Sequence, residues 1–516
     1  MRKMRVSKLF GRTLRQVEAK GSSGLRLLAR AGFLRWDPLS FLPLGAMVLD
    51  RLRTLWGNII GPDVQKLYLP FGEALSPEEQ ALRIASREVA SYRELPLRLE
   101  LEAEIGKSSP FYLPEGKAFL LLSFLPDEEM AQEEISGLWA KVEELLRVCR
   151  LQSPPPAIGR GWDWIVPEPE GEERLVICPN CGYSAPSVWA QVHREPLPQE
   201  EPEPLREVAT PGCTTIESLA SFLGVPKSKT AKAVFYTGED GGIVFAVIRG
   251  DMDVSEQKLS SAMGWVKLRP STEGELLFAG IVPGYASPIG VKGVKVAVDS
   301  SLRTGQNFVA GANREGYHLM GVNYPRDFQA DFEGDLALAK AGIQCPFCQS
   351  AFESASGFLV ASLRVSGPES SSARGLSFNT PQKKKANPWV VLLALYPYKV
   401  MEAVAQVNRD EKGLIWPKAL APFPIHLIAL GEEGLAEGEK LYSQLKGQGI
   451  EVLFDDRDES PGVKFTDADL IGLPWRVVVS KRSLSQGGIE VKSRAEAGSK
   501  IIPPEDFLRE FQSGNL

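Results

Sequence analysis

Apolar and polar residues follow helical and strand periods along most of this chain, and proline-rich breaks divide it into segments. Apolar residues recur at helical spacing from Met47 to Ile60, which predicts a helix there. Ser76-Pro77-Glu78-Glu79 supplies an N-cap, a proline at the first helical position and acids in the first turn, so a helix is expected over 76–92. The same reasoning predicts strands over 97–101 and 117–125 and a helix over 127–149.

The middle of the chain is expected to be mixed α/β, and its end to alternate strand with helix. Linkers rich in Pro, Glu or Ser are predicted over 153–172, 195–206 and 366–388. Apolar runs predict strands over 232–236, 243–248 and 294–298. Near the end, strands over 424–430, 450–454 and 475–480 alternate with helices over 435–448 and 465–472. That alternation indicates a small sheet flanked by helices.

Bulk composition indicates a soluble globular protein of several domains. The 516 residues are 43% hydrophobic and 24% charged, and no apolar run approaches the length of a membrane span. The basic N-terminus lacks the apolar core of a signal peptide, so a cytoplasmic location is expected. Because the net charge is −6, a nucleic-acid partner must meet a local basic patch.

Four of the six cysteines form two close pairs that predict a structural zinc site. Cys178 and Cys181 make one pair, and Cys345 and Cys348 make the other. Each pair has the spacing that lets two thiolates reach one tetrahedral ion. If the pairs share a metal, the intervening residues form an inserted domain whose two ends the metal joins.

Several ordered motifs resemble bacterial prolyl-tRNA synthetase, a class II aminoacyl-tRNA synthetase. Near the C-terminus these are Gly413-Leu-Ile-Trp-Pro417, Asp455-Asp-Arg457, Pro461-Gly-Val-Lys464-Phe465 and Asp469-Leu-Ile-Gly472-Leu-Pro474. Near the N-terminus, Ser7 to Leu14, Leu28 to Arg35 and Leu42-Pro-Leu-Gly45 look like that enzyme's start and its first class II motif. The resemblance covers nearly the whole chain and includes the inserted domain that the cysteines suggest.

The resemblance implies a multidomain α/β fold: an antiparallel class II core, an inserted α+β editing domain and a C-terminal α/β anticodon-binding domain. The expected boundaries are 1–176 and 351–412 for the core, 177–206 and 334–350 for the zinc ribbon and linker, 207–333 for the insert, and 413–516 for the anticodon-binding domain. Arg457, Lys464 and Phe465 are the implied tRNA contacts. The implied partner is tRNA(Pro), with a homodimer or a heterodimer with a true prolyl-tRNA synthetase expected, and no DNA.

The motifs that should activate proline are degenerate. Forming an aminoacyl adenylate needs fixed cations and close backbone approach to the nucleotide. The second class II motif falls on Lys107-Ser108-Ser109, without its Arg and Glu, and the third reaches Lys399 where an arginine is expected, with no glycines before it. Of the proline-recognition loop, Ser76-Pro77-Glu78 survives, and helix capping alone can explain it. The sequence thus resembles a divergent paralogue, with ATP and Mg needed only if ligase activity persists.

The inserted domain, in contrast, keeps the residues of the YbaK-like editing domain, which hydrolyses alanine wrongly attached to proline tRNA. Val225 to Lys232 matches the segment with the family's essential lysine, placed at Lys232 with Lys229 as second choice. The implied catalytic positions are Lys232, Gly284, Pro288, Asp299 and His318. Because an aminoacyl ester is labile, a small pocket, a cation and backbone N–H donors suffice for its hydrolysis.

Three functions remain open from the sequence. The first is a tRNA(Pro)-binding protein that clears alanyl-tRNA(Pro) and has lost proline activation. The second is a divergent but working proline–tRNA ligase. The third is a non-catalytic accessory subunit that binds tRNA or another protein.

Overall fold

The computed structural model describes residues 4–17, 21–36, 39–69, 75–106, 109, 111, 113, 115–153 and 161–513. Its residues form two compact units. One contains residues 1–62, 138–152 and 396–516, and the other contains 63–137 and 153–395. Among the described residues, no helix is both long and apolar enough to cross a membrane.

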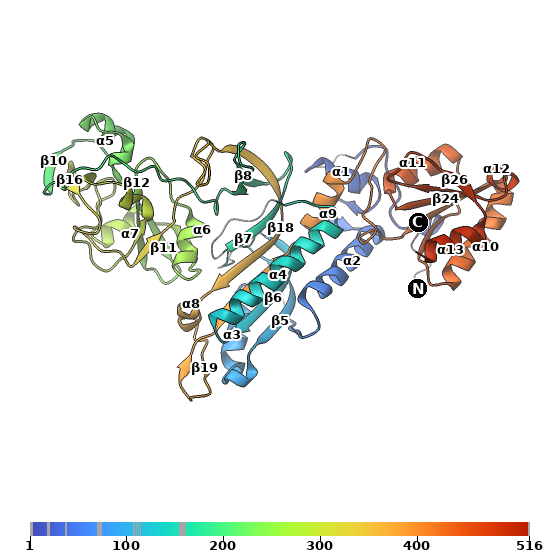
Figure 1. Ribbon diagram of the computed structural model, residues 1–516, viewed down its shortest axis with the longest axis horizontal. Helices are drawn as coiled ribbons and strands as arrows, with labels where there is room; N and C mark the ends of the chain where they lie inside the picture. The colour runs from blue at the N-terminus through green and yellow to red at the C-terminus, as the bar shows by residue number, and fades with distance from the viewer. Residues whose placement is uncertain are drawn as a thin grey trace. The chain divides into compact units, whose positions relative to one another are not determined.

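The second unit is built on an eight-stranded sheet (Figure 1). Its strands are β4 (Gln65–Lys66), β5 (Leu97–Ile105), β6 (Gly116–Leu125), β7 (Gly161–Pro167), β8 (Glu173–Ile177), β9 (Ser184–Pro186), β18 (Glu353–Ser366) and β21 (Trp389–Leu395). All pairings except β4–β5 are antiparallel, which confirms the expected antiparallel core. Helix α3 (Pro77–Glu88) begins at the predicted Ser76 cap, and α4 (Glu128–Val148) matches the other predicted helix.

Two of the predicted linkers contain regular structure. The first contains β7, because the apolar run from Trp162 to Val166 pairs with β18 in spite of its proline-rich flanks. The third contains α8 (Pro368–Ala373) and a short hairpin of β19 (Phe378–Asn379) with β20 (Lys385–Ala386). Both predictions were wrong because polar composition does not exclude local hydrogen bonding or tertiary pairing.

The insert adds two small sheets, which share a large apolar core. A five-stranded sheet runs β13-β11-β12-β14-β17 and a three-stranded sheet runs β10-β16-β15. The strands are β10 (Arg206–Ala209), β11 (Ala231–Gly238), β12 (Ile243–Arg249), β13 (Leu268–Pro270), β14 (Lys295–Asp299), β15 (Phe308–Gly311), β16 (Tyr317–Val322) and β17 (Phe332–Gly334), with helices α5 (Ile216–Leu223), α6 (Glu256–Ala262) and α7 (Glu273–Phe278). Phe245, Val298 and Phe308 lie at the centre of that core and are inaccessible to solvent.

The first unit combines two helices from the N-terminal region and one from residues 397–407 with a C-terminal α/β domain. The helices are α1 (Ser23–Arg30), α2 (Pro43–Ile60) and α9 (Pro397–Val407). The six-stranded sheet runs β1-β23-β22-β24-β25-β26. Its elements are β1 (Met4–Arg5), β22 (Ile425–Leu430), β23 (Val452–Asp455), β24 (Trp475–Ser480), β25 (Ile489–Ser493), β26 (Lys500–Ile502), α10 (Gly431–Gly447), α11 (Pro461–Ile471), α12 (Lys481–Ser485) and α13 (Pro504–Gln512). The predicted alternation of strand and helix is therefore present.

Candidate functional site

A cavity of about 420 Å³ lies in the insert where β11, the end of β12 and the loop at Gly284 meet. Lys232, Gly284 and His318, three of the predicted catalytic residues, line it together with Gly311 and Asp253. The sequence assigned these positions separately, and the fold brings them to one hollow. A hollow of this size lies within the range of small-molecule binding sites.

The Lys232 ammonium is held at this cavity by a carboxylate. Its Nζ donates to Asp253 Oδ1 at 2.5 Å, and Lys340 Nζ donates to Asp253 Oδ2 at the same distance. Hydrogen bonds from both lysines lower the pKa of Asp253, so the carboxylate stays charged. Lys229 lies elsewhere, because its Nζ donates to the Gln306 carbonyl and pairs with Glu200. The geometry favours Lys232 over Lys229.

Two glycines of the cavity stand where a side chain does not fit. Gly284 has φ +80°, and a Cβ there would meet Thr214 Cβ at 3.0 Å. A Cβ on Gly311 would meet the Tyr285 carbonyl oxygen at 2.1 Å. Asn313 fastens the loop between them, since its backbone N–H donates to the Tyr285 carbonyl and its side chain accepts from the Ser287 N–H. The loop is thereby fixed with its backbone close to the cavity.

His318 is a neutral ring in the cavity wall. It is 4% exposed, and its Nδ1 is 2.6 Å from Thr210 Oγ1. Burial lowers the pKa of His318 to about 4, so the imidazole carries no charge near neutral pH. The ring can position a substrate by hydrogen bonding but cannot act there as a permanent cation.

Asp299 and Pro288 do not line this cavity. Asp299 is inaccessible to solvent and accepts two hydrogen bonds from Arg194, at 3.1 and 2.8 Å, and one from the Leu336 N–H. Arg194 also pairs with Asp335, which accepts from the buried Lys258. Asp299 therefore belongs to a charged network that joins the two connecting segments to the insert, and we leave it out of the candidate site.

The four paired cysteines come together as a candidate metal centre. Their sulfur atoms all lie within 4.8 Å of one another, with Cys178 and Cys348 at 3.3 Å and Cys181 and Cys345 at 3.7 Å. A tetrahedral zinc–thiolate site requires sulfur separations of about 3.8 Å, so the donor set fits such an ion. In each pair, the backbone N–H of the first cysteine donates to the carbonyl of the residue five positions later. Cys178 donates to Tyr183, and Cys345 donates to Ser350.

On the core sheet, neither face of the central strands is open. Arg364, Leu392, Leu122 and Leu99 are successive neighbours across β18, β21, β6 and β5, and all four are 8% exposed or less. The next row, Ser362, Ala394, Leu120 and Leu101, is also buried. On the opposite face, Ser123 and Arg98 donate to Glu134 of α4, which covers that side.

Arg364 is the charged residue in those two buried rows, and it is committed to the fold. Its guanidinium donates to the carbonyls of Phe111 and Trp162 and pairs with Asp163 at 2.8 Å. Trp265, from the insert, lies 5.6 Å from it and donates its indole N–H to the Val365 carbonyl. The Arg364 guanidinium is therefore engaged by contacts within the protein.

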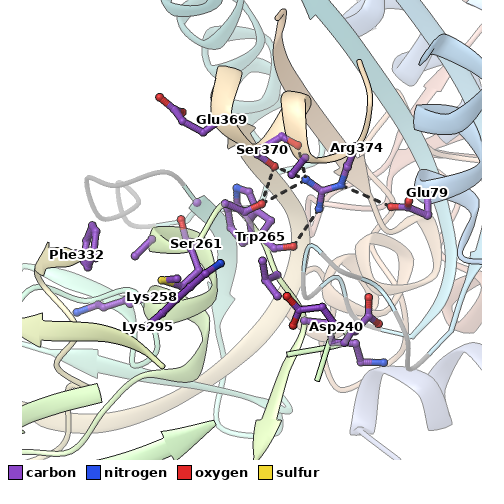
Figure 2. A pocket seen from close by; sticks show the side chains of 18 of the residues that line it. Glu79, Asp240, Lys258, Ser261, Trp265, Lys295, Phe332, Glu369, Ser370 and Arg374 are labelled. Atoms are coloured by element: carbon purple, nitrogen blue, oxygen red, sulfur yellow. Dashed lines mark hydrogen bonds and ion pairs between the residues drawn. The ribbon is translucent and has the colours of Figure 1, made fainter. Parts of the chain in front are cut away.

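Figure 2 shows how the insert is held against the sheet beside a larger hollow of about 940 Å³. Ser370 Oγ donates to the Gly264 carbonyl at 2.6 Å, and Arg374 donates to the Trp265 carbonyl at 3.0 Å while pairing with Glu79. Trp265 itself is inaccessible to solvent and packs against Trp189. The hollow carries acids and bases in similar number, so its charge selects no ligand.

Among the predicted degenerate ligase positions, Glu78 is unusual. It is inaccessible to solvent, and neither carboxylate oxygen has a hydrogen-bond partner among the residues that the structure describes. Burial raises its pKa, which neighbouring Ser109 and Ser76 offset in part. Lys399 pairs with Glu402 on its own helix at 3.4 Å, and Lys107 lies outside the described residues. Helix capping by Ser76 does not explain a buried Glu78.

Comparison with known proteins identifies the family of this chain. It is 35% identical to a proline–tRNA ligase of Dehalococcoides mccartyi, over 98% of both chains. It is 33% identical to one of Salinispora tropica, over 98% of this chain and 96% of that one. The chain belongs to the proline–tRNA ligase family. A prolyl-tRNA synthetase structure from Cryptosporidium parvum matches more loosely, at 12% identity over 95% of this chain and 78% of that one, with a TM-score of 0.47.

Two domain families also match parts of this chain. Residues 210–327 match an aminoacyl-tRNA editing domain, and 425–513 match an anticodon binding domain. The Dehalococcoides alignment spans 562 positions, whereas this chain has 516 residues, so at least 46 aligned positions have no counterpart here.

In the anticodon-binding domain, the predicted tRNA contacts serve internal interactions. Arg457 donates two hydrogen bonds to the buried Asp455 and pairs with Asp467 at 2.9 Å. Lys464 is 3% exposed and donates to the Ala429 carbonyl. Phe465 lies under the Arg476 guanidinium at 4.8 Å. Their role in binding tRNA stays a prediction, and these contacts do not favour it.

Sequence reasoning missed Asp253 and Trp265. Asp253 stands four residues after Arg249 at the end of β12, in a segment with two acids, and only the fold shows which acid faces Lys232. Trp265 has φ +63°, a backbone conformation that its sequence does not signal. One hint of the unusual backbone at Trp265 is present in the sequence: this residue directly follows a glycine just after helix α6.

Proposed function

We propose that this protein hydrolyses alanyl-tRNA(Pro) in the insert cavity and has lost proline activation in its core. The cavity that joins Lys232, Gly284, Gly311 and His318 carries the proposal. Lys232 would attract the terminal phosphates of the tRNA, and the fixed loop would present backbone N–H groups to the ester carbonyl. Water is the attacking group, and the ester bond to the ribose breaks.

Substrate choice follows from the size of the cavity. Its wall includes the side chains of Phe235, Met252 and Ala286. Two substrates can differ in size by more than one methylene group. A cavity that excludes the larger one then discriminates more strongly than favourable apolar contacts can. We therefore infer that the cavity admits alanine and rejects the larger ring of proline.

The core supports the second half of the proposal. An adenylate-forming site needs fixed cations on an accessible surface. Here the central sheet rows are buried, Arg364 is saturated by carbonyls and Asp163, and Lys399 pairs with Glu402.

A working proline–tRNA ligase is the second candidate, and Glu78 favours it. A buried carboxylate without a hydrogen-bond partner among the described residues would be satisfied by a cationic ligand such as an amino group. Identities of 35% and 33% to named proline–tRNA ligases over 98% of this chain point the same way. Proline can still bind there without being activated, so activation has to be measured separately from binding.

The direct test is hydrolysis of two aminoacyl-tRNAs by the purified full chain. Alanyl-tRNA(Pro) should be deacylated at least about tenfold faster than prolyl-tRNA(Pro), the discrimination expected of a steric pocket. Spontaneous hydrolysis without protein provides the baseline. Equal rates for both substrates, or no rate above the baseline, would contradict the proposed editing function.

A further inference from the structure

A groove of about 900 Å³ lies in the first unit, between residues 15–17, helix α1 and the turn that follows α9. Five exposed cations line it: Arg15, Arg26, Arg30, Arg409 and Lys412. They come from three separate segments of the chain, so the sequence does not show them as one basic run.

The groove carries a net positive charge. Its two acids are Asp410 and Glu411. Asp410 is neutralised by Arg494, which donates to both of its carboxylate oxygens at 2.6 and 2.7 Å and holds its pKa far below the usual range. Arg15 and Arg30 make no ion pair with any acid among the described residues.

The walls of the groove are fixed by close packing of α1 on α9. Gly24 N–H donates to Gln406 Oε1 at 2.7 Å, and Ser22 Oγ donates to Glu402 at 2.7 Å. A Cβ on Gly24 would meet Gln406 N at 2.8 Å, so the helices approach as closely as glycine permits. Leu14 N–H donates to the Arg30 carbonyl, which ties the segment carrying Arg15 to the same helix.

We propose that this groove binds the phosphate backbone of RNA. Cations that are exposed and held on a rigid surface gain affinity by releasing the counterions of a polyanion. Such a local patch is what a chain with a net charge of −6 requires for any nucleic-acid partner. Arg15, Arg30 and Lys412 of the groove are exposed, whereas Arg457 and Lys464 are committed to internal contacts.

The inference rests on the proposed tRNA partner and adds where that partner is held. The groove lies in the same unit as the residues that match an anticodon binding domain. The groove would contact phosphates and not bases, so it would contribute affinity for any tRNA. Other contacts would then select tRNA(Pro).

The test compares two triple variants that change net charge equally. The groove variant is Arg15→Gln, Arg30→Gln and Lys412→Gln. The control is Lys440→Gln, Lys481→Gln and Lys500→Gln, three exposed lysines that pair with Glu437, Glu433 and Glu510. Binding of a tRNA(Pro) transcript to the full chain is measured across a salt series, with circular dichroism to confirm that both variants fold.

The groove variant should bind about tenfold or more weakly at low salt, and its slope of log affinity against log salt should fall by about 0.7–0.9 for each phosphate that the variant no longer neutralises. The control should keep the wild-type slope. Equal reductions in both variants, or no change in the groove variant, would overturn the inference while leaving the editing function intact. Failure of the wild type to bind any tRNA would overturn both, whereas binding without hydrolysis would count against the editing function alone.

Discussion

Replacing Lys232 by alanine should reduce the rate of alanyl-tRNA(Pro) hydrolysis by about 100-fold or more, because the cavity loses the ammonium group that is proposed to attract the substrate phosphates. Asp253 would then face the substrate phosphates with Lys340 as its remaining partner, which adds repulsion to the missing attraction. Single-turnover deacylation with enzyme in excess measures the effect. The fold should be retained, since Lys232 is partly exposed and makes no other side-chain hydrogen bond that the structure shows.

Lys229→Ala is the matched control for that experiment. Lys229 lies three residues away, has the same charge and lies outside the cavity, so its loss should change the hydrolysis rate by less than about threefold. A larger loss from Lys229→Ala than from Lys232→Ala would mean that the catalytic lysine is misassigned. If neither substitution matters because no hydrolysis occurs, the accessory-subunit alternative gains support.

Removing the metal should unfold the two cysteine-containing turns but leave the insert folded. Zinc content should be one ion per chain, and Cys178→Ser with Cys345→Ser should reduce it to zero, because each pair loses a ligand. Amides of residues 178–183 and 345–352 should then lose hydrogen-exchange protection. Strands β11 and β12 should keep theirs, because the Arg194–Asp299 network and the Trp265 contact hold the insert without any cysteine.

Cys149→Ser serves as the control for metal content, since Cys149 is buried away from the paired cysteines and should leave one zinc ion in place. Loss of protection throughout β11 and β12 after chelation would contradict this expectation. It would show that the metal supports the insert's own fold and not only the connection between insert and core.

Local sequence patterns predicted most elements because they depend on short-range rules. The Ser76 cap, the apolar run at β12 and the strand–helix alternation after 424 all act within a few residues. The two-residue spacing within each cysteine pair is a local pattern of the same kind, and it identifies the candidate metal ligands. Strands such as β7 were missed because their stability comes from pairing with β18, almost 200 residues away in sequence.

Side-chain roles were harder to predict than elements. Asp299 and Arg457 are charged residues at strand ends, a position shared by catalytic and structural groups, and only their partners distinguish the two. Glu78 shows the reverse case, because its helix-capping sequence has a local explanation whereas its complete burial is seen only in the fold. Ion pairs and burial depend on contacts between distant segments, which a single sequence does not specify.

The measurement that bears most directly on the division between insert and core is proline-dependent exchange of pyrophosphate into ATP. It should be made on a zinc-loaded preparation that hydrolyses alanyl-tRNA(Pro), with the Dehalococcoides mccartyi enzyme as positive control. The expected result is hydrolysis with exchange no faster than the background without proline. Proline-dependent exchange at an ordinary synthetase rate, on the order of 1 s⁻¹ or faster, would contradict the loss of proline activation.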